Sequence, residues 1–127
     1  MNKKGFTLVE LLGVITVLAI IGVITMPIVN ETIKNSKEKA YKAQIKEIEK
    51  AAKDYTAENM NLILDGSTLC PSLVPVEITS IDVETLIDEG YIPEDTKDPK
   101  TEELIQGVVY ITYDCEYDSY KYEYRNN

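Results

Sequence analysis

The sequence contains no histidine and no tryptophan, and it has only one phenylalanine and two cysteines among 127 residues. Without histidine the chain lacks the commonest general base and the commonest metal ligand of proteins. It also has no glycine-rich phosphate loop and no motif that would activate a nucleophile. No catalytic constellation can be assembled from what remains, so an enzyme is the least favoured class and no cofactor is expected.

Charge is almost absent from residues 5–30, where Glu10 is the single ionisable side chain. As a helix this segment would reach about 39 Å at roughly 1.5 Å per residue, more than the ~30 Å hydrocarbon core of a bilayer. A carboxylate in such a segment is costly to bury and therefore marks function. A secretory signal peptide is a poorer interpretation, because the apolar run is too long and no Ala-x-Ala site follows it.

The residues before this segment complete a recognisable pattern: Lys3, Lys4, Gly5 and Phe6, with Glu10 five residues after the glycine. The pattern resembles the processing site of type IV prepilins and pseudopilins. The resemblance implies that a prepilin peptidase cuts after Gly5 and methylates the new amino terminus of Phe6. It also implies a pilin-like α+β fold, in which a long N-terminal helix packs on a small antiparallel sheet.

We expect the chain to contain four segments. They are a leader peptide (1–5), a transmembrane and assembly helix (6–30), an amphipathic stem helix (31–60) and a small acidic α+β head (61–127). A head of about 70 residues lies near the lower limit for a self-sufficient core.

The stem shows one apolar stripe at helical spacing, which predicts that it lies on the head. The stripe consists of Tyr41, Ile45, Ile48, Ala52 and Tyr55. Earlier in the helix Pro27 removes a hydrogen bond and clashes with the preceding turn, and Gly22 lowers helix propensity nearby. These two residues predict a kink in the helix.

The head contains both cysteines, Cys70 and Cys115. A single cysteine pair in a small exported domain predicts a disulfide rather than a metal or redox site. A short helix is expected over residues 81–89, with Thr79 or Ser80 as its cap and Gly90 as its stop.

Two strands, 108–113 and 119–124, are predicted to form a hairpin. In the second strand Tyr120, Tyr122 and Tyr124 share one face. This tyrosine row is expected to cover the stem helix, and a ligand-binding aromatic surface is the alternative.

The segment 86–93, followed by Asp98 and Pro99, resembles the heads of Gram-positive pilins and major pseudopilins. Secretion pseudopilins can bind calcium in a loop at this place, but their usual Trp-Gly is replaced here by Lys100 and Thr101. A solvated acidic loop is therefore favoured over a metal site. The hard oxygen ligands available to calcium would come from Asp95, Asp98, Glu102 and Glu103, with Asp95 and Asp98 the main candidates.

Charge is segregated along the chain. Residues 31–59 carry seven lysines against six acidic residues (7 − 6 = +1), whereas residues 60–127 carry four basic against fifteen acidic residues (4 − 15 = −11). Phosphate binding needs clustered lysine and arginine, so no nucleic acid is expected on the head. Solubility is the simplest reason for such acidity.

These features favour a structural subunit of a type IV pilus-like filament, a helical homopolymer formed through the N-terminal helix. The resemblance implies membrane lipid as the environment before assembly and a pilus or secretion assembly platform as a partner. The alternative within the family is a pseudopilin or minor pilin of a type II secretion or competence DNA-uptake system. A monomeric membrane-anchored binding domain needs neither Gly5 nor Glu10. In the filament, Glu10 is expected to pair with the Phe6 amine of a neighbour; the alternatives are a role in peptidase recognition alone, or a neutral carboxyl group with no role.

The head is expected outside a single-pass membrane protein and then on an extracellular filament. Counting lysines near the segment gives the opposite orientation, because five lie on the head side, from Lys34 to Lys46, against two before it. The processing motif and the cysteine pair favour the head outside.

Overall fold

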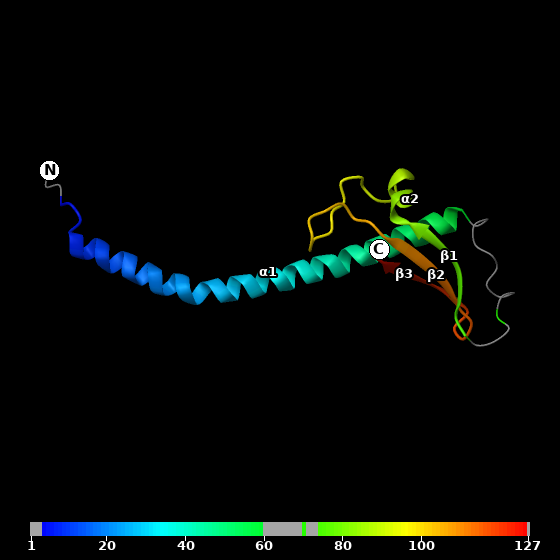
Figure 1. The fold of residues 1–127 in the computed structure, drawn as a ribbon, viewed down its shortest axis with the longest axis horizontal. Coiled ribbons are helices and arrows are strands. Elements are labelled where there is room, and N and C mark those ends of the chain that lie inside the picture. Colours follow the sequence, from blue (N-terminus) through cyan, green and yellow to red (C-terminus); the bar gives the residue numbers. More distant parts are fainter. Residues whose placement is uncertain (1–3, 60–69, 71–73, 127) are drawn as a thin grey trace. The chain divides into compact units, whose positions relative to one another are not determined.

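The computed structural model describes residues 4–59, 70 and 74–126. Helix α1 spans Leu8–Glu58 and is followed by strand β1 (Val76–Asp82), helix α2 (Val83–Asp88), strand β2 (Val108–Asp114) and strand β3 (Ser119–Arg125) (Figure 1). This is the predicted α+β arrangement of a long helix with a small antiparallel sheet. The chain divides into two compact units, Met1–Lys37 and Glu38–Asn127, with the boundary inside α1.

In the first unit every described residue from Lys4 to Ser36 is exposed. The threonine hydroxyls along the helix are satisfied by the helix itself. Three threonine hydroxyls each donate to the carbonyl oxygen four residues earlier: Thr16 to Leu12 (2.7 Å), Thr25 to Ile21 (3.0 Å) and Thr32 to Ile28 (2.8 Å). Such internal bonds suit a helix in apolar surroundings, where no water is available to satisfy a hydroxyl.

Helix α1 continues through Gly22 and Pro27, which lies inside it. Proline has no N–H, so one helical hydrogen bond is missing at this point. The kink expected there stays a prediction.

In the second unit the three strands form an antiparallel sheet in the order β1–β2–β3. The predicted hairpin is confirmed, and each of its strands extends one residue further than expected, to Asp114 and Arg125. On β2, Val109 and Ile111 point inward and are fully buried. They pair with Tyr124 and Tyr122 of β3, which places part of the tyrosine row over the core.

The prediction for residues 79–90 was wrong at its start. Thr79 and Ser80 do not cap a helix, because they lie within β1, where Ser80 pairs with Tyr110 of β2. Helix α2 begins only at Val83, and its N-cap Asp82 makes no side-chain cap hydrogen bond. The β-branched residues of this segment favour a strand once a partner strand is available. The end was predicted correctly, since α2 stops at Asp88 and Gly90 has a positive φ of 81°.

The core of the head forms between the sheet, α2 and the Glu38–Glu58 part of α1 (Figure 1). Its centre contains Ile48 and Ala52 of α1, Leu86 of α2, and the inward side chains of β2. The predicted apolar stripe is therefore confirmed as the buried face of the stem. Two further residues on α1, Ala51 and Thr56, are buried as well.

The tyrosine row covers the stem through two of its three members. The Tyr122 hydroxyl and Thr56 Oγ1 are hydrogen-bonded at 2.8 Å. The Tyr124 backbone N–H donates to Glu49 Oε1 at 3.2 Å, and the Tyr124 ring is buried. Tyr120 instead makes an edge contact with Tyr113, with 5.1 Å between ring centroids.

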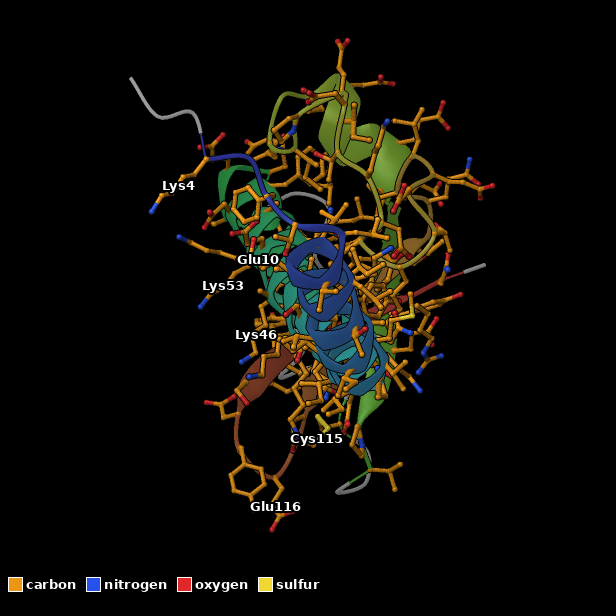
Figure 2. All side chains as sticks on the ribbon, turned by 90° about the vertical axis from the view of Figure 1, so that its left-hand side faces the viewer. Lys4, Glu10, Lys46, Lys53, Cys115 and Glu116 are labelled. Carbon is orange, nitrogen blue, oxygen red and sulfur yellow. A yellow bond between two sulfur atoms is a disulfide. The ribbon has the colours of Figure 1, made fainter. Side chains whose placement is uncertain are left out.

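Cys70 and Cys115 form the predicted disulfide, with a Cα–Cα distance of 6.0 Å across 45 residues of sequence. Cys115 directly follows β2, near the hairpin turn (Figure 2). The disulfide therefore ties the region after the stem to the end of the central strand.

Candidate functional site

The N-terminus of α1 is closed by a reciprocal pair of hydrogen bonds between Thr7 and Glu10. The Thr7 backbone N–H donates to Glu10 Oε2 at 3.0 Å, and the Glu10 backbone N–H donates to Thr7 Oγ1 at 3.3 Å. The Thr7 carbonyl accepts the first helical bond from Leu11 at 3.2 Å. Thr7 is therefore the N-cap and Glu10 the third helical residue, which is the geometry of a capping box.

This capping box explains how a carboxylate is held at the start of an apolar helix. The first turn of any helix leaves backbone N–H groups without a helical partner. Here the side chains of Thr7 and Glu10 each accept a hydrogen bond from the backbone N–H of the other residue. The positive end of the helix dipole also favours a negative charge at Glu10. Both residues follow Gly5, so a cut after Gly5 would leave the capping box within the mature chain.

The role of Thr7 was not predicted from the sequence. The signal was present, because Thr7-Leu8-Val9-Glu10 has the threonine-x-x-glutamate spacing of a capping box directly before an apolar run.

An open hollow with a volume of about 670 Å³ lies beside Glu10. Apart from the Glu10 carboxylate its lining is apolar: Phe6, Gly13, Val14, Val17 and Leu18. A side chain at Gly13 would meet no atom within 4 Å, so the glycine leaves open space next to the carboxylate. Glu10 Oε2 is occupied by Thr7, and within the described residues no hydrogen bond reaches Glu10 Oε1. The hollow thus offers one carboxylate oxygen, in apolar surroundings, to a second molecule.

Gly5 and Phe6 lie before the first turn of α1 and are both exposed. A Cβ atom added at Gly5 would meet nothing within 4 Å, so the fold of this chain does not require glycine there. A requirement for glycine would have to come from another molecule. Cleavage after Gly5 and methylation of Phe6 stay predictions, as does an assembly role for Glu10.

The loop that carries the calcium candidates is organised around Asp98, which is buried. Asp98 Oδ1 accepts a hydrogen bond from the Lys100 backbone N–H at 2.7 Å, so the carboxylate closes its own turn. Lys100 also forms a 2.7 Å ion pair with Glu38 of α1. Asp95 is exposed, and the described residues contain no group of three or more acidic, histidine or cysteine side chains suited to a metal. The solvated acidic loop stays the prediction for this segment, and calcium binding stays its untested alternative.

Helix α1 is long and apolar enough to cross a membrane, with a mean hydropathy of 2.6 over its most apolar window, none of which is buried. No curated protein and no solved structure matches the chain. A family model does match: residues 1–26 fit the prokaryotic N-terminal methylation motif. The match contains the glycine, the phenylalanine and the capping box described above. Residues 1–26 therefore carry the signature of type IV prepilins, on a chain whose long helix and small antiparallel sheet are pilin-like.

Proposed function

We propose that this chain is a structural subunit of a type IV pilus-like filament. It is cut after Gly5, methylated at Phe6 and polymerised through α1. The observation that carries the proposal is the methylation motif of residues 1–26 on a helix whose apolar side chains have no partner in their own unit. The motif alone supports a type IV pilin or pseudopilin; the filament role is the step we add.

The exposed apolar surface is the physical reason for polymerisation. From Phe6 to Ile33 the large apolar side chains are each at least 50% exposed. A contiguous apolar surface of this kind is not stable in water and marks a membrane or protein interface. Lipid covers it before assembly, and the same helix of neighbouring subunits covers it in the filament. A prepilin peptidase and an assembly platform in the membrane are the partners that this path requires.

Glu10 sets the register of assembly in this proposal. After cleavage the amino group of Phe6 is a cation, and Glu10 Oε1 accepts no hydrogen bond within the described residues. Pairing this oxygen with the Phe6 amine of a neighbour offsets the burial of both charges, whereas a misaligned subunit leaves them unpaired in an apolar environment. The carboxylate would therefore penalise every wrong register.

We favour a pilus subunit over a pseudopilin. Lys100 and Thr101 stand where secretion pseudopilins usually have Trp-Gly, and the head is closed by a disulfide. The small α+β head fits a structural protein. The candidate site lies near the N-terminus, on the exposed part of α1, rather than in a catalytic cleft.

The test is Glu10→Leu, which keeps the helix and makes it more apolar. Breaking a buried charge pair costs about 3–5 kcal/mol, so we expect at least a tenfold loss of sheared filaments while cleavage continues and subunits accumulate in the membrane. The matched control is Glu31→Leu, which removes a carboxylate from the same helix and should leave filaments unchanged. Filaments at the wild-type level from Glu10→Leu would exclude the assembly role, and an uncleaved Glu10→Leu chain would restrict Glu10 to peptidase recognition.

A further inference from the structure

Five lysines form one face of α1 in the second unit. They are Lys39, Lys42, Lys46, Lys50 and Lys53; all are exposed, and successive members lie three or four residues apart. At 3.6 residues per turn they fall within an arc of about 80°, on the side opposite Ile48 and Ala52. Figure 2 shows Lys46 and Lys53 projecting to the same side. We call these five residues the lysine face.

Among the described residues the lysine face has few partners. Lys42 has an ion pair with Glu38 at 3.8 Å, but within the part of the chain that the structure describes the other four lysines form none. Like charges three or four residues apart on a helix repel each other and destabilise it. An acidic surface placed against this face would remove that repulsion.

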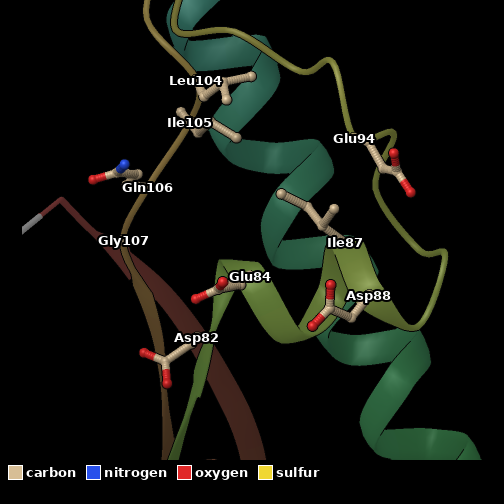
Figure 3. Close-up of a pocket in the computed structure, with 9 residues that line it drawn as sticks. All are labelled: Asp82, Glu84, Ile87, Asp88, Glu94, Leu104, Ile105, Gln106 and Gly107. Atoms are coloured by element: carbon tan, nitrogen blue, oxygen red, sulfur yellow. The ribbon is translucent and has the colours of Figure 1, made fainter.

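The head carries an acidic cavity of about 520 Å³ between the end of β1, α2 and the segment before β2 (Figure 3). Its lining includes four carboxylates, Asp82, Glu84, Asp88 and Glu94, and three large apolar side chains: Ile87, Leu104 and Ile105. Counting only described residues, none of the four carboxylates has a hydrogen bond or an ion pair through its side chain. We call this site the acidic cavity.

The two surfaces are complementary in chemistry. A lysine side chain has a long apolar stem and a charged tip, and it is most stable where the stem lies on apolar groups and the tip meets water or carboxylates. The lining of the acidic cavity offers the apolar side chain of Leu104, which is 57% exposed, beside carboxylates that have no side-chain partner among the described residues. The charge of the whole chain follows the same division, since residues 60–127 carry a net −11.

We propose that the lysine face of one copy docks on the acidic cavity of a second copy. The inference rests on the proposed filament and adds a contact outside its apolar helices. The contact joins different surfaces of the two copies, so it is heterologous and can repeat into an open helical array. Because it is electrostatic and solvent-exposed at its edges, added salt should weaken it.

An anionic membrane surface is the other possible partner of a basic helix. Two observations favour a second copy. The head that the lysine face accompanies is strongly acidic and would be repelled by anionic lipid. Lys39, the first lysine of the face, follows Val29, the last apolar residue of the 5–30 segment, by ten residues. Along a helix this is farther than the about 8 Å within which attraction to a charged surface fades at physiological salt.

The first test cross-links wild-type filaments with a carbodiimide, which joins an amine to a carboxylate in direct contact. We expect cross-linked peptides that join lysines of residues 39–53 to Asp82, Glu84, Asp88 or Glu94. Monomers dispersed in detergent are the control and should lack these links, because the lysine face points away from its own head. Filaments that yield other lysine–carboxylate links but not these would overturn the proposal.

The second test reverses charges on each surface and then on both. Lys46→Glu with Lys50→Glu, and separately Glu84→Lys with Asp88→Lys, should each lower filament yield at least about tenfold while cleavage continues. Combining the four substitutions should restore yield at least threefold over either pair. Glu77→Lys with Glu116→Lys makes the same change of charge away from the cavity and should have no effect.

The outcomes separate this inference from the proposed function. If wild-type cells form filaments and both charge reversals also form them at the wild-type level, the docking contact is wrong and the filament proposal stands. If the wild-type chain forms no filaments, both fail. If the lysine reversal instead lowers binding to phosphatidylglycerol-containing vesicles and leaves filaments intact, the partner of the lysine face is lipid and our proposal is overturned.

Discussion

The two parts of helix α1 differ in where their side chains find partners. In the unit that ends at Lys37 no described residue is buried, whereas in Glu38–Glu58 one face is covered by the head, with Ile48 only 1% exposed. The same backbone geometry therefore serves two environments. The second part completes its packing within the chain, and in the proposed function the first completes it against lipid or other copies.

Polar groups follow the same division. In the first part the threonine hydroxyls and the Thr7–Glu10 pair bond within the helix itself. In the second part polar groups reach other elements, as Gln44 does to the Lys97 carbonyl at 2.8 Å. A helix that keeps its polar bonds local can exchange one apolar environment for another without breaking them, as the proposed transfer from a membrane into a filament would require.

The largest expected effect comes from matched leucine truncations in the two parts. Leu86→Ala empties a fully buried site and should lower the free energy of unfolding of the head by about 2–5 kcal/mol. Leu18→Ala removes a side chain that is 61% exposed and should leave the head unchanged within about 0.5 kcal/mol. All nine tyrosines belong to the second unit, so thermal unfolding followed by their near-ultraviolet signal reports on the head alone. Equal effects of the two substitutions would contradict the division.

The next effect is that of the disulfide. Replacing Cys70 and Cys115 together by serine should destabilise the head by roughly 2–4 kcal/mol, because the unfolded chain gains the freedom that the closed loop removes. A reducing agent should lower the melting temperature of the wild-type head by a similar amount and leave the double variant unchanged. A wild-type head that melts at the same temperature under reducing conditions would contradict this prediction.

A smaller effect is expected at the capping box. Thr7→Val removes the hydroxyl that accepts from Glu10 N–H and should cost about 1 kcal/mol locally. Amide exchange at Glu10, measured by NMR in micelles, should become about fivefold faster, since 1 kcal/mol is roughly a factor of five. Thr7→Ser keeps the hydroxyl and should exchange at the wild-type rate, and the head should melt normally in both variants. Unchanged exchange in Thr7→Val would exclude the capping box.

The smallest effect concerns pH and the hairpin turn of the head. Hydrogen bonding from Lys121, helped by the Glu116 and Tyr117 backbone N–H groups, holds the pKa of Asp114 below its ordinary value of 3.8. A lowered pKa stabilises the fold above the ordinary value, and this contribution is lost as the pH falls through the lowered pKa. The melting temperature of Asp114→Asn should therefore be lower than that of the wild type at neutral pH, and this difference in melting temperature should shrink below pH 3.8. A difference that is constant with pH would reject this role.

Much of the fold could be predicted because its signals are local. The long apolar segment of residues 5–30, the apolar stripe of the stem and the alternation in the hairpin are each recognised from residues a few positions apart. The disulfide could be predicted because the two cysteines are the only pair in a small domain that is expected to be exported. These features are confirmed where the described residues include them.

Strand β1 could not be predicted in the same way. Its residues Thr79 and Ser80 are common helix caps, and only pairing with β2, about thirty residues later, makes them a strand. The acidic cavity likewise needs β1, α2 and the segment before β2 to converge. The capping box is different, because its spacing was present in the sequence and was overlooked.

Intact-mass analysis of the protein from membranes and from sheared filaments tests the central claim most directly. The account predicts that the wild-type chain lacks residues 1–5 and carries one added methyl group on Phe6. Gly5→Val should retain the five-residue leader and be absent from filaments, although the fold has room for its side chain. A full-length wild-type mass, or a normally processed Gly5→Val chain, would contradict the account.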